Sequence, residues 1–275
     1  MDNNDILKTI EEFGLFTGEE GKKSRDSFFI ENGFPIDQKA DYVILSSCLQ
    51  PSLMPNVFIS FKKLLEYYNV NYTFLSKEYC CGYMPLVQPA ILSKDKDELN
   101  KAENLSKRYL ERNLENTINL SAKYIVVFCS GCYIMYTYYK NSTSVGDMIQ
   151  KDQNIKIVSY IDLIDRIFSK GRLEMNADFY AGCYRANKIV TSDNAEDFVK
   201  KSLNILERIE GLKLNFLDNR LCCAKSNDSK NLIGSMKTPN LINICTGCYN
   251  NTMPIAINNG YNVFMLPDIV LKSLI

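Results

Sequence analysis

The chain has 275 residues, which exceeds the length of a typical single domain and predicts two domains. Its 32 Lys and Arg residues balance 32 Asp and Glu residues, which argues against a nucleic-acid binder that relies on net positive charge. Hydrophobic residues make up 46% of the chain, enough for a sizeable core, but no apolar run is long enough to span a bilayer. The first residues are acidic and no apolar signal segment follows them, so we expect a cytoplasmic protein, with any membrane association made through a partner.

Residues 1–40 contain no cysteine and are predicted to form an N-terminal extension. Apolar residues between Ile6 and Phe16 have the spacing of a short amphipathic helix. The polar stretch Gly18–Ser24 superficially resembles a phosphate-binding loop, but its glycine and lysine spacing is wrong and no strand precedes it. We therefore expect a solvated turn there, and a role for the extension as a cap or a docking segment.

From residue 41 onward, short apolar runs alternate with stretches of helical periodicity, which predicts an α/β fold with mostly parallel sheets. In the first half we expect strands over residues 42–45, 72–75, 124–128 and 155–158, and helices over residues 56–68, 94–120 and 162–168. In the second half we expect strands over residues 177–180, 213–216, 241–244 and 262–265, with helices over residues 195–209 and after residue 268. Asp162 is predicted to be the N-cap of its helix.

The two halves share one plan, which predicts two similar Rossmann-like units that arose by internal duplication. Tyr160–Ile164 and Leu266–Val270 occupy the same place in the two halves, and this match does not depend on the cysteines. We expect a boundary near Lys170, with one α/β domain over residues 41–170 and the other over residues 171–275.

All ten cysteines belong to two copies of one pattern, which consists of a lone cysteine, a vicinal pair and a Cys-x-Gly-Cys motif. The first copy comprises Cys48, Cys80, Cys81, Cys129 and Cys132, and the second comprises Cys183, Cys222, Cys223, Cys245 and Cys248. The cysteines follow predicted strands, and ligands of parallel sheets gather at the carboxyl ends of the strands. Each copy is therefore predicted to converge on one edge of its sheet.

The cysteine pattern is typical of a metal site. In a reducing compartment, clustered thiols more often bind metals or carry redox chemistry than form disulfides. The chain has no histidine, which removes mixed Cys/His zinc sites and the commonest general base. All-thiolate ligation favours iron–sulfur clusters, with zinc as the competitor. Zinc would use four thiolates in each half and leave one cysteine over.

The order Cys…Cys-Cys-Gly…Cys-x-x-Cys, present twice over residues 41–275, resembles the cysteine-rich CCG-domain family. Its best-understood member is the cysteine-rich subunit of heterodisulfide reductase, and relatives include iron–sulfur subunits of organic-acid oxidation. The resemblance implies two non-cubane 4Fe-4S clusters, each held by the five cysteines of one copy, through which those cysteines would take part in catalysis. It also implies an oxidoreductase subunit that acts on sulfur groups, reducing or forming a disulfide of a small thiol substrate.

The resemblance further implies a partner that delivers electrons, either an iron–sulfur subunit with cubane clusters or a flavoprotein. No flavin or nicotinamide motif occurs in the chain, which agrees with that expectation. Two alternatives stay open. The chain could be an electron-transfer subunit of an organic-acid or quinone-linked dehydrogenase, or a zinc-binding structural subunit.

The two copies differ in their surroundings. Residues 82–128 separate the pair from the Cys-x-Gly-Cys motif in the first copy, whereas the shorter stretch 224–244 does so in the second, where Ala224 replaces the glycine after the pair. Charges near the first copy, Lys77 and Glu78, are expected to cancel. Those near the second are Arg185, Lys188, Arg220 and Lys225 against Asp218. Of these cations, Arg185, Lys188 and Lys225 are candidates for binding an anionic substrate, and a solvated basic edge is the alternative.

Overall fold

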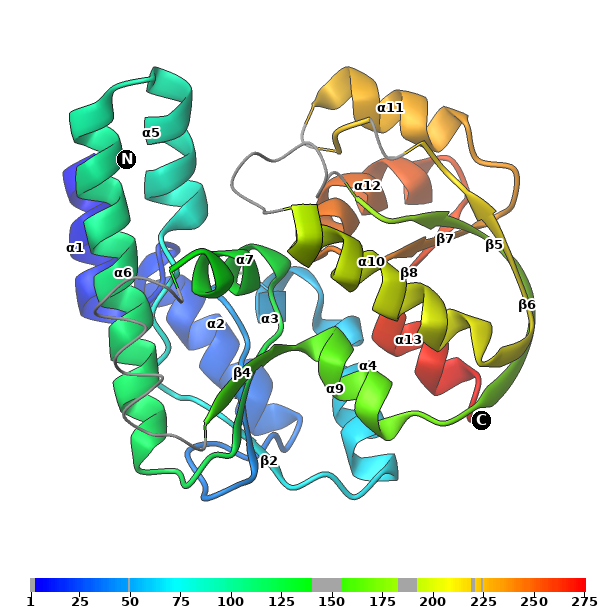
Figure 1. Ribbon diagram of the computed structural model, residues 1–275, viewed down its shortest axis with the longest axis horizontal. Coiled ribbons are helices and arrows are strands. Elements are labelled where there is room, and N and C mark those ends of the chain that lie inside the picture. The colour runs from blue at the N-terminus through cyan, green and yellow to red at the C-terminus, as the bar shows by residue number, and fades with distance from the viewer. Residues whose placement is uncertain (1–2, 49, 140–154, 183–191, 219–220, 224) are drawn as a thin grey trace. The chain divides into compact units, whose positions relative to one another are not determined.

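A computed structural model of the chain describes residues 3–48, 50–139, 155–182, 192–218, 221–223 and 225–275 (Figure 1). By its internal packing the chain divides into two compact units. Unit 1 comprises residues 1–55 and 70–159, and unit 2 comprises residues 56–69 and 160–275. The sequence domains proposed above, with divisions after residues 40 and 170, stay predictions.

Unit 1 contains a four-stranded sheet in which all neighbouring strands are parallel and the order is β2-β1-β3-β4. The strands are β1 (Tyr42–Leu45), β2 (Tyr72–Phe74), β3 (Tyr124–Val127) and β4 (Lys156–Ser159). Val43, Ile44 and Leu45 of β1 are all buried, so this strand is covered on both faces. Continuous apolar runs of this kind are expected in parallel sheets, because crossover connections place helices on both faces.

Unit 2 contains a second four-stranded parallel sheet, with the corresponding order β6-β5-β7-β8. Its strands are β5 (Gly171–Tyr180), β6 (Ile209–Phe216), β7 (Asn240–Asn243) and β8 (Asn262–Met265). The same order of equivalent strands recurs in the two sheets. The predicted α/β class, with two similar parallel units, is therefore confirmed.

The helices of unit 1 are α1 (Asn3–Phe13), α2 (Gly18–Glu31), α3 (Gln50–Leu53), the π-helical turn η1 (Tyr83–Val87), α5 (Gln88–Ser93), α6 (Lys96–Ile118) and α7 (Ser130–Tyr139). Ile10 of α1 and Tyr109 and Leu110 of α6 join the core that Val43 and Ile125 of the sheet also form. The N-terminal segment is therefore an integral part of unit 1, and the long helix α6 lies beside it in Figure 1.

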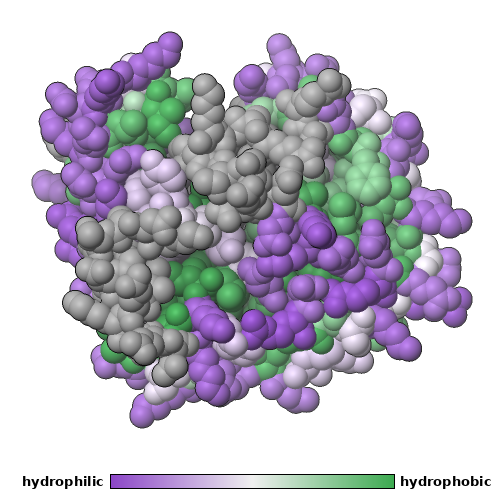
Figure 2. Space-filling view, in the orientation of Figure 1, coloured by the Kyte–Doolittle hydropathy of each residue, from purple (hydrophilic) through white to green (hydrophobic). Residues whose placement is uncertain are grey.

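The helices of unit 2 are α4 (Pro55–Tyr67, from residue 56 on), α9 (Tyr160–Ile167), α10 (Ser192–Glu207), α11 (Ser226–Gly234), α12 (Thr246–Asn258) and α13 (Leu266–Lys272). Helix α10 packs on β6, while α12 and α13 pack on β7 and β8. The outward side of α10 forms a hydrophilic band on the face shown in Figure 2. None of the helices in the described ranges is long and apolar enough to cross a membrane.

Two local predictions were wrong. Gly18–Ser24 is not a solvated turn but the start of α2, because Arg25 and Phe29 bury one side of that helix. Asp162 is not an N-cap, since α9 already begins at the buried residue Tyr160. Asp162 lies in the first turn instead, where its carboxylate accepts a 2.6 Å hydrogen bond from Lys201 Nζ.

Candidate metal centre

The first thiol group, comprising Cys48, Cys80, Cys81, Cys129 and Cys132, gathers at one edge of the first sheet. Cys48 follows β1, the vicinal pair follows β2, and Cys129 follows β3, so three adjacent strands deliver their cysteines to the same edge. Cys80, Cys81 and Cys132 are buried, and they belong to the hydrophobic core of unit 1. The strand order thus brings together residues that are far apart in the sequence.

Within the first thiol group the sulfur atoms interact in succession, from Cys48 to Cys80, Cys81, Cys132 and Cys129. Cys81 accepts hydrogen bonds from the thiols of Cys132 and Cys80, which holds its pKa well below the ordinary value. Hydrogen bonds with Cys48 and Cys81 raise the pKa of Cys80, and those with Cys129 and Cys81 raise that of Cys132, with burial adding to both. Of the three buried thiols of this group, Cys81 is therefore the one whose thiolate form is favoured by its neighbours.

The second thiol group, which we define as the cysteines of the second copy, repeats one contact of the first group among its described members. The Sγ atoms of Cys223 and Cys248 lie 3.3 Å apart, and the hydrogen bond between them lowers the pKa of Cys223. Hydrogen bonds with Cys223 and Cys245, together with burial, raise the pKa of Cys248. In both units, the second cysteine of the vicinal pair is hydrogen-bonded to the last cysteine of the Cys-x-Gly-Cys motif.

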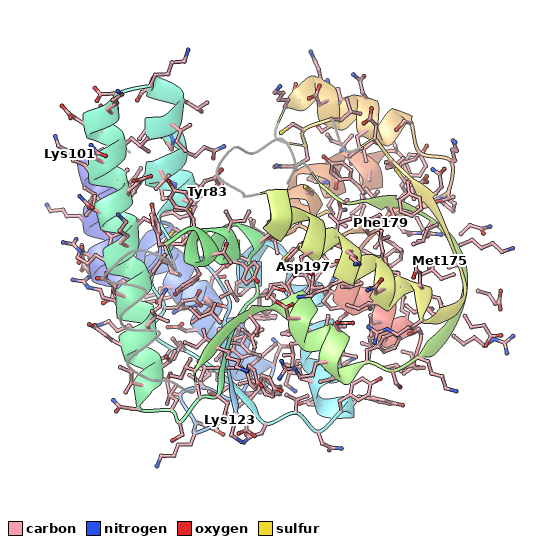
Figure 3. The ribbon with its side chains drawn as sticks, in the orientation of Figure 1. Tyr83, Lys101, Lys123, Met175, Phe179 and Asp197 are labelled. Atoms are coloured by element: carbon pink, nitrogen blue, oxygen red, sulfur yellow. The ribbon has the colours of Figure 1, made fainter. Side chains whose placement is uncertain are left out.

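The two Cys-x-Gly-Cys motifs also have matching backbone positions. Helix α7 begins directly after Cys129 and α12 directly after Cys245, so Cys132 and Cys248 lie in the first turns of their helices. Backbone N–H groups and the helix dipole favour negative charge at such a position. A Cβ on the intervening glycine would lie 3.7 Å from Cys129 Sγ in the first motif and 3.8 Å from Cys245 Sγ in the second. Cδ1 of Tyr83, a residue labelled in Figure 3, would lie 3.8 Å from a Cβ added to Gly131 in the first motif.

Glu78 holds the loop of Cys48 in place, and the sequence patterns did not point to it. This buried carboxylate accepts hydrogen bonds from Ser46 N and Ser46 Oγ, both at 2.8 Å, and from Ser47 N at 2.6 Å. Burial raises its pKa, although the charge of Arg25 and the hydrogen bonds from Ser46 and Ser47 oppose the shift. Lys77 lies over the Tyr79 ring, and the cation whose charge acts on Glu78 is Arg25, so the expected balance of charge between Lys77 and Glu78 stays a prediction.

Helix α6 supports the loop of the first vicinal pair through two buried side chains. Asn113 accepts a 2.6 Å hydrogen bond from Tyr79 N and donates one of 2.7 Å to Tyr79 O. Ser106 Oγ donates a 2.6 Å hydrogen bond to Cys81 O. Helical spacing of Ser106 and Asn113 was the only available signal for these contacts, since neither residue lies near a cysteine in the sequence. The long stretch 82–128 therefore supplies supports for the pair.

The vicinal pair of the second thiol group has a different support. Asp228 accepts a 3.1 Å hydrogen bond from Cys222 N, and Tyr180 donates one of 2.5 Å to the carbonyl of Leu221. Asn251 donates a weak hydrogen bond of 3.7 Å to Cys223 Sγ. Cys222 is half-buried. The predicted ligand Cys183 lies outside the described residues.

Of the predicted substrate-binding cations, only Lys225 lies within the described part of the chain. Its side chain is exposed, and its backbone N–H donates a 2.9 Å hydrogen bond to Cys222 O at the start of α11. Arg185, Lys188 and Arg220 lie outside the described residues. Asp228 is a further acidic residue at this edge. The sequence did not point to it, because it is not among the charged residues closest to the cysteines along the chain.

The chemistry of the donors fits a sulfur-ligated group. In the described residues no three Cys, Asp or Glu side chains surround a single point that could hold one metal ion. The first thiol group nevertheless links five soft donors from three strand ends through successive pairwise contacts, and the buried carboxylate of Glu78 is occupied by backbone and serine donors. Cys48, Cys80, Cys81, Cys129 and Cys132 could therefore hold an iron–sulfur cluster.

These features define the class of domain. Unit 1 is a parallel α/β unit with a thiol-lined edge at the carboxyl ends of its strands. Residues 42–137 match the family model of the cysteine-rich domain CCG, so this part of the chain is similar to CCG domains. Such domains occur in iron–sulfur oxidoreductase subunits. The match contains all five cysteines of the first thiol group and ends before the second.

Comparisons with whole proteins add little. No curated protein matches the sequence. Among solved structures, the arabinose-binding protein AraP from Geobacillus stearothermophilus is similar over 82% of this chain and 72% of its own, with 11% identity and a TM-score of 0.28. A likeness at that level carries no argument about fold or function.

Proposed function

We propose that this chain is an iron–sulfur oxidoreductase subunit similar to the cysteine-rich subunit of heterodisulfide reductase, with two non-cubane 4Fe-4S clusters. The observation that carries the proposal is the repeated geometry at the strand ends, with Cys81 in contact with Cys132 in the first thiol group and Cys223 in contact with Cys248 in the second. The Cys-x-Gly-Cys motifs of both groups lie at helix N-termini, where thiolates and an anionic cluster are stabilised. The similarity of residues 42–137 to CCG domains supports the same class.

Each thiol group would hold one cluster. Cys48, Cys80, Cys81, Cys129 and Cys132 would hold the first, and Cys183, Cys222, Cys223, Cys245 and Cys248 the second. Such clusters supply one-electron transfer and the chemistry that cleaves or forms a disulfide. The protein residues position and shield them: burial of Cys80, Cys81 and Cys132 limits the access of water. Glu78 and Asn113 fix the loops on which Cys48 and Cys80 lie.

Metal analysis of the anaerobically purified chain tests the proposal. We expect about eight iron and eight labile sulfide per chain, from two 4Fe-4S clusters. One zinc with about four iron would indicate a mixed protein, and zinc alone would favour the structural subunit. A chain that takes up no iron after anaerobic reconstitution would contradict the proposal.

We propose that the substrate is a small anionic thiol or disulfide that contacts the cations near the second thiol group. Lys225 supports this through its exposed position next to Cys222. Replacing Lys225, Arg185 or Lys188 by alanine should leave the metal content unchanged and weaken substrate binding by about 1–3 kcal/mol per charge-assisted hydrogen bond lost. Unchanged kinetics in all three variants would favour a solvated basic edge.

We further propose that electrons reach this chain from an iron–sulfur subunit with cubane clusters or from a flavoprotein. The absence of a Gly-x-Gly-x-x-Gly motif after any strand in the sequence supports a separate partner for hydride chemistry. Anaerobic copurification should recover such a subunit. Turnover of NADH with a disulfide by the isolated chain would contradict this part of the proposal.

A further inference from the structure

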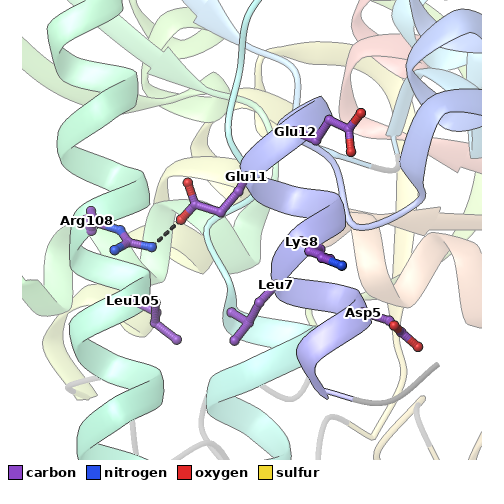
Figure 4. Close-up of a pocket in the computed structure, with 7 residues that line it drawn as sticks. All are labelled: Asp5, Leu7, Lys8, Glu11, Glu12, Leu105 and Arg108. Carbon is purple, nitrogen blue, oxygen red and sulfur yellow. Dashed lines mark hydrogen bonds and ion pairs between the residues drawn. The ribbon is translucent and has the colours of Figure 1, made fainter.

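The N-terminal segment contacts the cysteine loop of the first thiol group directly. Helix α1 ends at Phe13, and the next residue, Gly14, accepts a 2.6 Å hydrogen bond from Cys80 N through its carbonyl oxygen. On its other side α1 is tied to α6, because Glu11 forms ion pairs with Arg108 and Arg112. Figure 4 shows the first of these pairs spanning the two helices. The carbonyl of Gly14 is thereby held against the loop of the vicinal pair.

Gly14 leaves no room for a side chain at this contact. A Cβ at this position would lie 2.3 Å from the carbonyl oxygen of Glu78 and 3.2 Å from its carbonyl carbon. Its φ of +77° also belongs to the left-handed region that favours glycine. Gly33 offers a comparison, because its φ is +62° and an added Cβ there would meet nothing within 4 Å. The two glycines share the backbone requirement, and only Gly14 combines it with close approach to the loop.

Arg25 of α2 provides a second contact with the same loop. Its side chain is 1% exposed, and Nη2 donates a 2.6 Å hydrogen bond to Ser76 O. A buried guanidinium needs an opposite charge nearby; Asp26 forms an ion pair with Arg25 at 3.2 Å, and the charge of Glu78 also acts on it. Glu78 in turn binds the backbone of Ser46 and Ser47, next to Cys48. Arg25 therefore acts on the two loops that carry Cys48 and the vicinal pair.

We propose that residues 3–31 form one wall of the first metal centre and that Gly14 and Arg25 are positioning residues for Cys80, Cys81 and Cys48. The inference rests on the proposed function only in treating the thiol group as a metal centre. It gives the N-terminal segment a task within the centre, in place of the cap or docking role expected from the sequence. Neither residue needs to touch the metal or the substrate.

The decisive experiment compares Gly14→Ala with Gly33→Ala in the full-length chain after iron has been removed by a chelator. Alkylation rates of Cys80 and Cys81 are measured by mass spectrometry, with Cys223 and Cys248 of unit 2 as internal references. We expect Gly14→Ala to raise the rates at Cys80 and Cys81 roughly ten-fold and to leave the reference rates unchanged, because local opening exposes the loop. Gly33→Ala should leave all four rates within about two-fold of the wild type.

Two results would overturn the proposal. The first is an unchanged rate at Cys80 and Cys81 in Gly14→Ala. The second is an equal rise at the reference cysteines, which would show that the segment supports the whole fold. Arg25→Gln provides an independent variant with the same expected pattern, and Arg25→Lys, which keeps the charge, should restore protection of Cys80 at least in part. Equal exposure in Arg25→Gln and Arg25→Lys would contradict the role assigned to the charge.

A measurement on the metal-loaded chain tests whether residues 3–31 affect the first metal centre itself. Gly14→Ala should lose or alter the EPR signal of the first cluster while the signal of the second persists, and Gly33→Ala should retain both. Identical signals in Gly14→Ala and the wild type would overturn the proposal. If the chain binds zinc instead of iron, the alkylation comparison keeps its meaning. Failure of the proposed function is therefore distinguishable from failure of this inference.

Discussion

The first thiol group is supported from outside the repeated unit, whereas the second is supported by its own repeat. Gly14, Glu78 and Asn113 bind the backbone of the loops around the first group, and two of these residues come from α6 and the N-terminal segment. In the second group, Asp228 and Tyr180 make the corresponding contacts from α11 and β5. One feature of the sulfur atoms is nevertheless shared, since a neighbouring thiol lowers the pKa of the second cysteine of the vicinal pair in each group, Cys81 and Cys223.

This difference shows how two copies of one site can diverge without changing their ligands. The segments that distinguish unit 1, residues 3–31 and the long α6, add buried hydrogen bonds around the vicinal pair. Each such bond resists displacement because breaking it leaves a buried polar group without a partner. We therefore expect the first thiol group to be the more rigid of the two, and three sets of variants test that comparison.

The largest effect is expected from removing one thiol in each group. Cys81→Ser and Cys223→Ser should each lose about four of roughly eight iron, because each substitution removes one thiolate ligand of one cluster and leaves the other cluster intact. Iron and sulfide analysis with EPR of the reduced protein measures the loss. Complete loss of iron from either single substitution would show that the two groups depend on one another.

The second largest effect is expected from removing one supporting side chain of each thiol group. Asn113→Leu deletes both hydrogen bonds to the backbone of Tyr79 and should cost about 3 kcal/mol in the free energy of unfolding of unit 1. Asn251→Leu deletes a 3.7 Å contact to sulfur and should cost less than about 1 kcal/mol in unit 2. Urea unfolding with a probe in each unit compares them. Equal losses would contradict the greater support of the first group.

The smallest effect is expected at equivalent acids of the repeats, Asp162 and Asp268. Burial raises the pKa of Asp268, although hydrogen bonds from Ser60 and Met265 N oppose the shift. Because the pKa of Asp268 is raised in the folded state, its protonated carboxyl makes its full contribution to folding stability below the unfolded pKa of 3.8. That contribution is lost as the pH rises through the folded-state pKa. Asp268→Asn should therefore gain stability relative to the wild type between pH 4 and pH 7, on the order of 1 kcal/mol.

Asp162→Asn is the matched control for the preceding variant. Asp162 forms a partly exposed ion pair with Lys201, so its loss should lower the free energy of unfolding at pH 7 by less than about 1 kcal/mol. The two substitutions are thus expected to have opposite signs at neutral pH. Urea unfolding across the same pH range measures both, and a gain at Asp162 or a loss at Asp268 that grows with pH would refute the assignment.

Much of the fold could be predicted because its signals are local. The apolar run Tyr42–Leu45 and the helical spacing around Phe58 and Phe61 report burial directly, and the structure has β1 and α4 at these places. Gly18–Ser24 was misjudged because its polar residues face solvent on a helix whose buried side is provided by Arg25 and Phe29 further along. Local polarity alone cannot reveal a helix of that kind.

The sequence by itself determined the soft donors of the candidate site: ten cysteines in two ordered copies, with no histidine, limit the chemistry to thiolate ligation. It also determined the parallel strand pattern, which places the described cysteines of each copy at one edge of their own sheet. Only the tertiary structure decided which other residues hold the loops. Gly14, Glu78 and Asn113 act through backbone contacts across long sequence separations, and such contacts require no particular spacing or motif. Their positions follow from helix packing against the sheet, which no local pattern specifies.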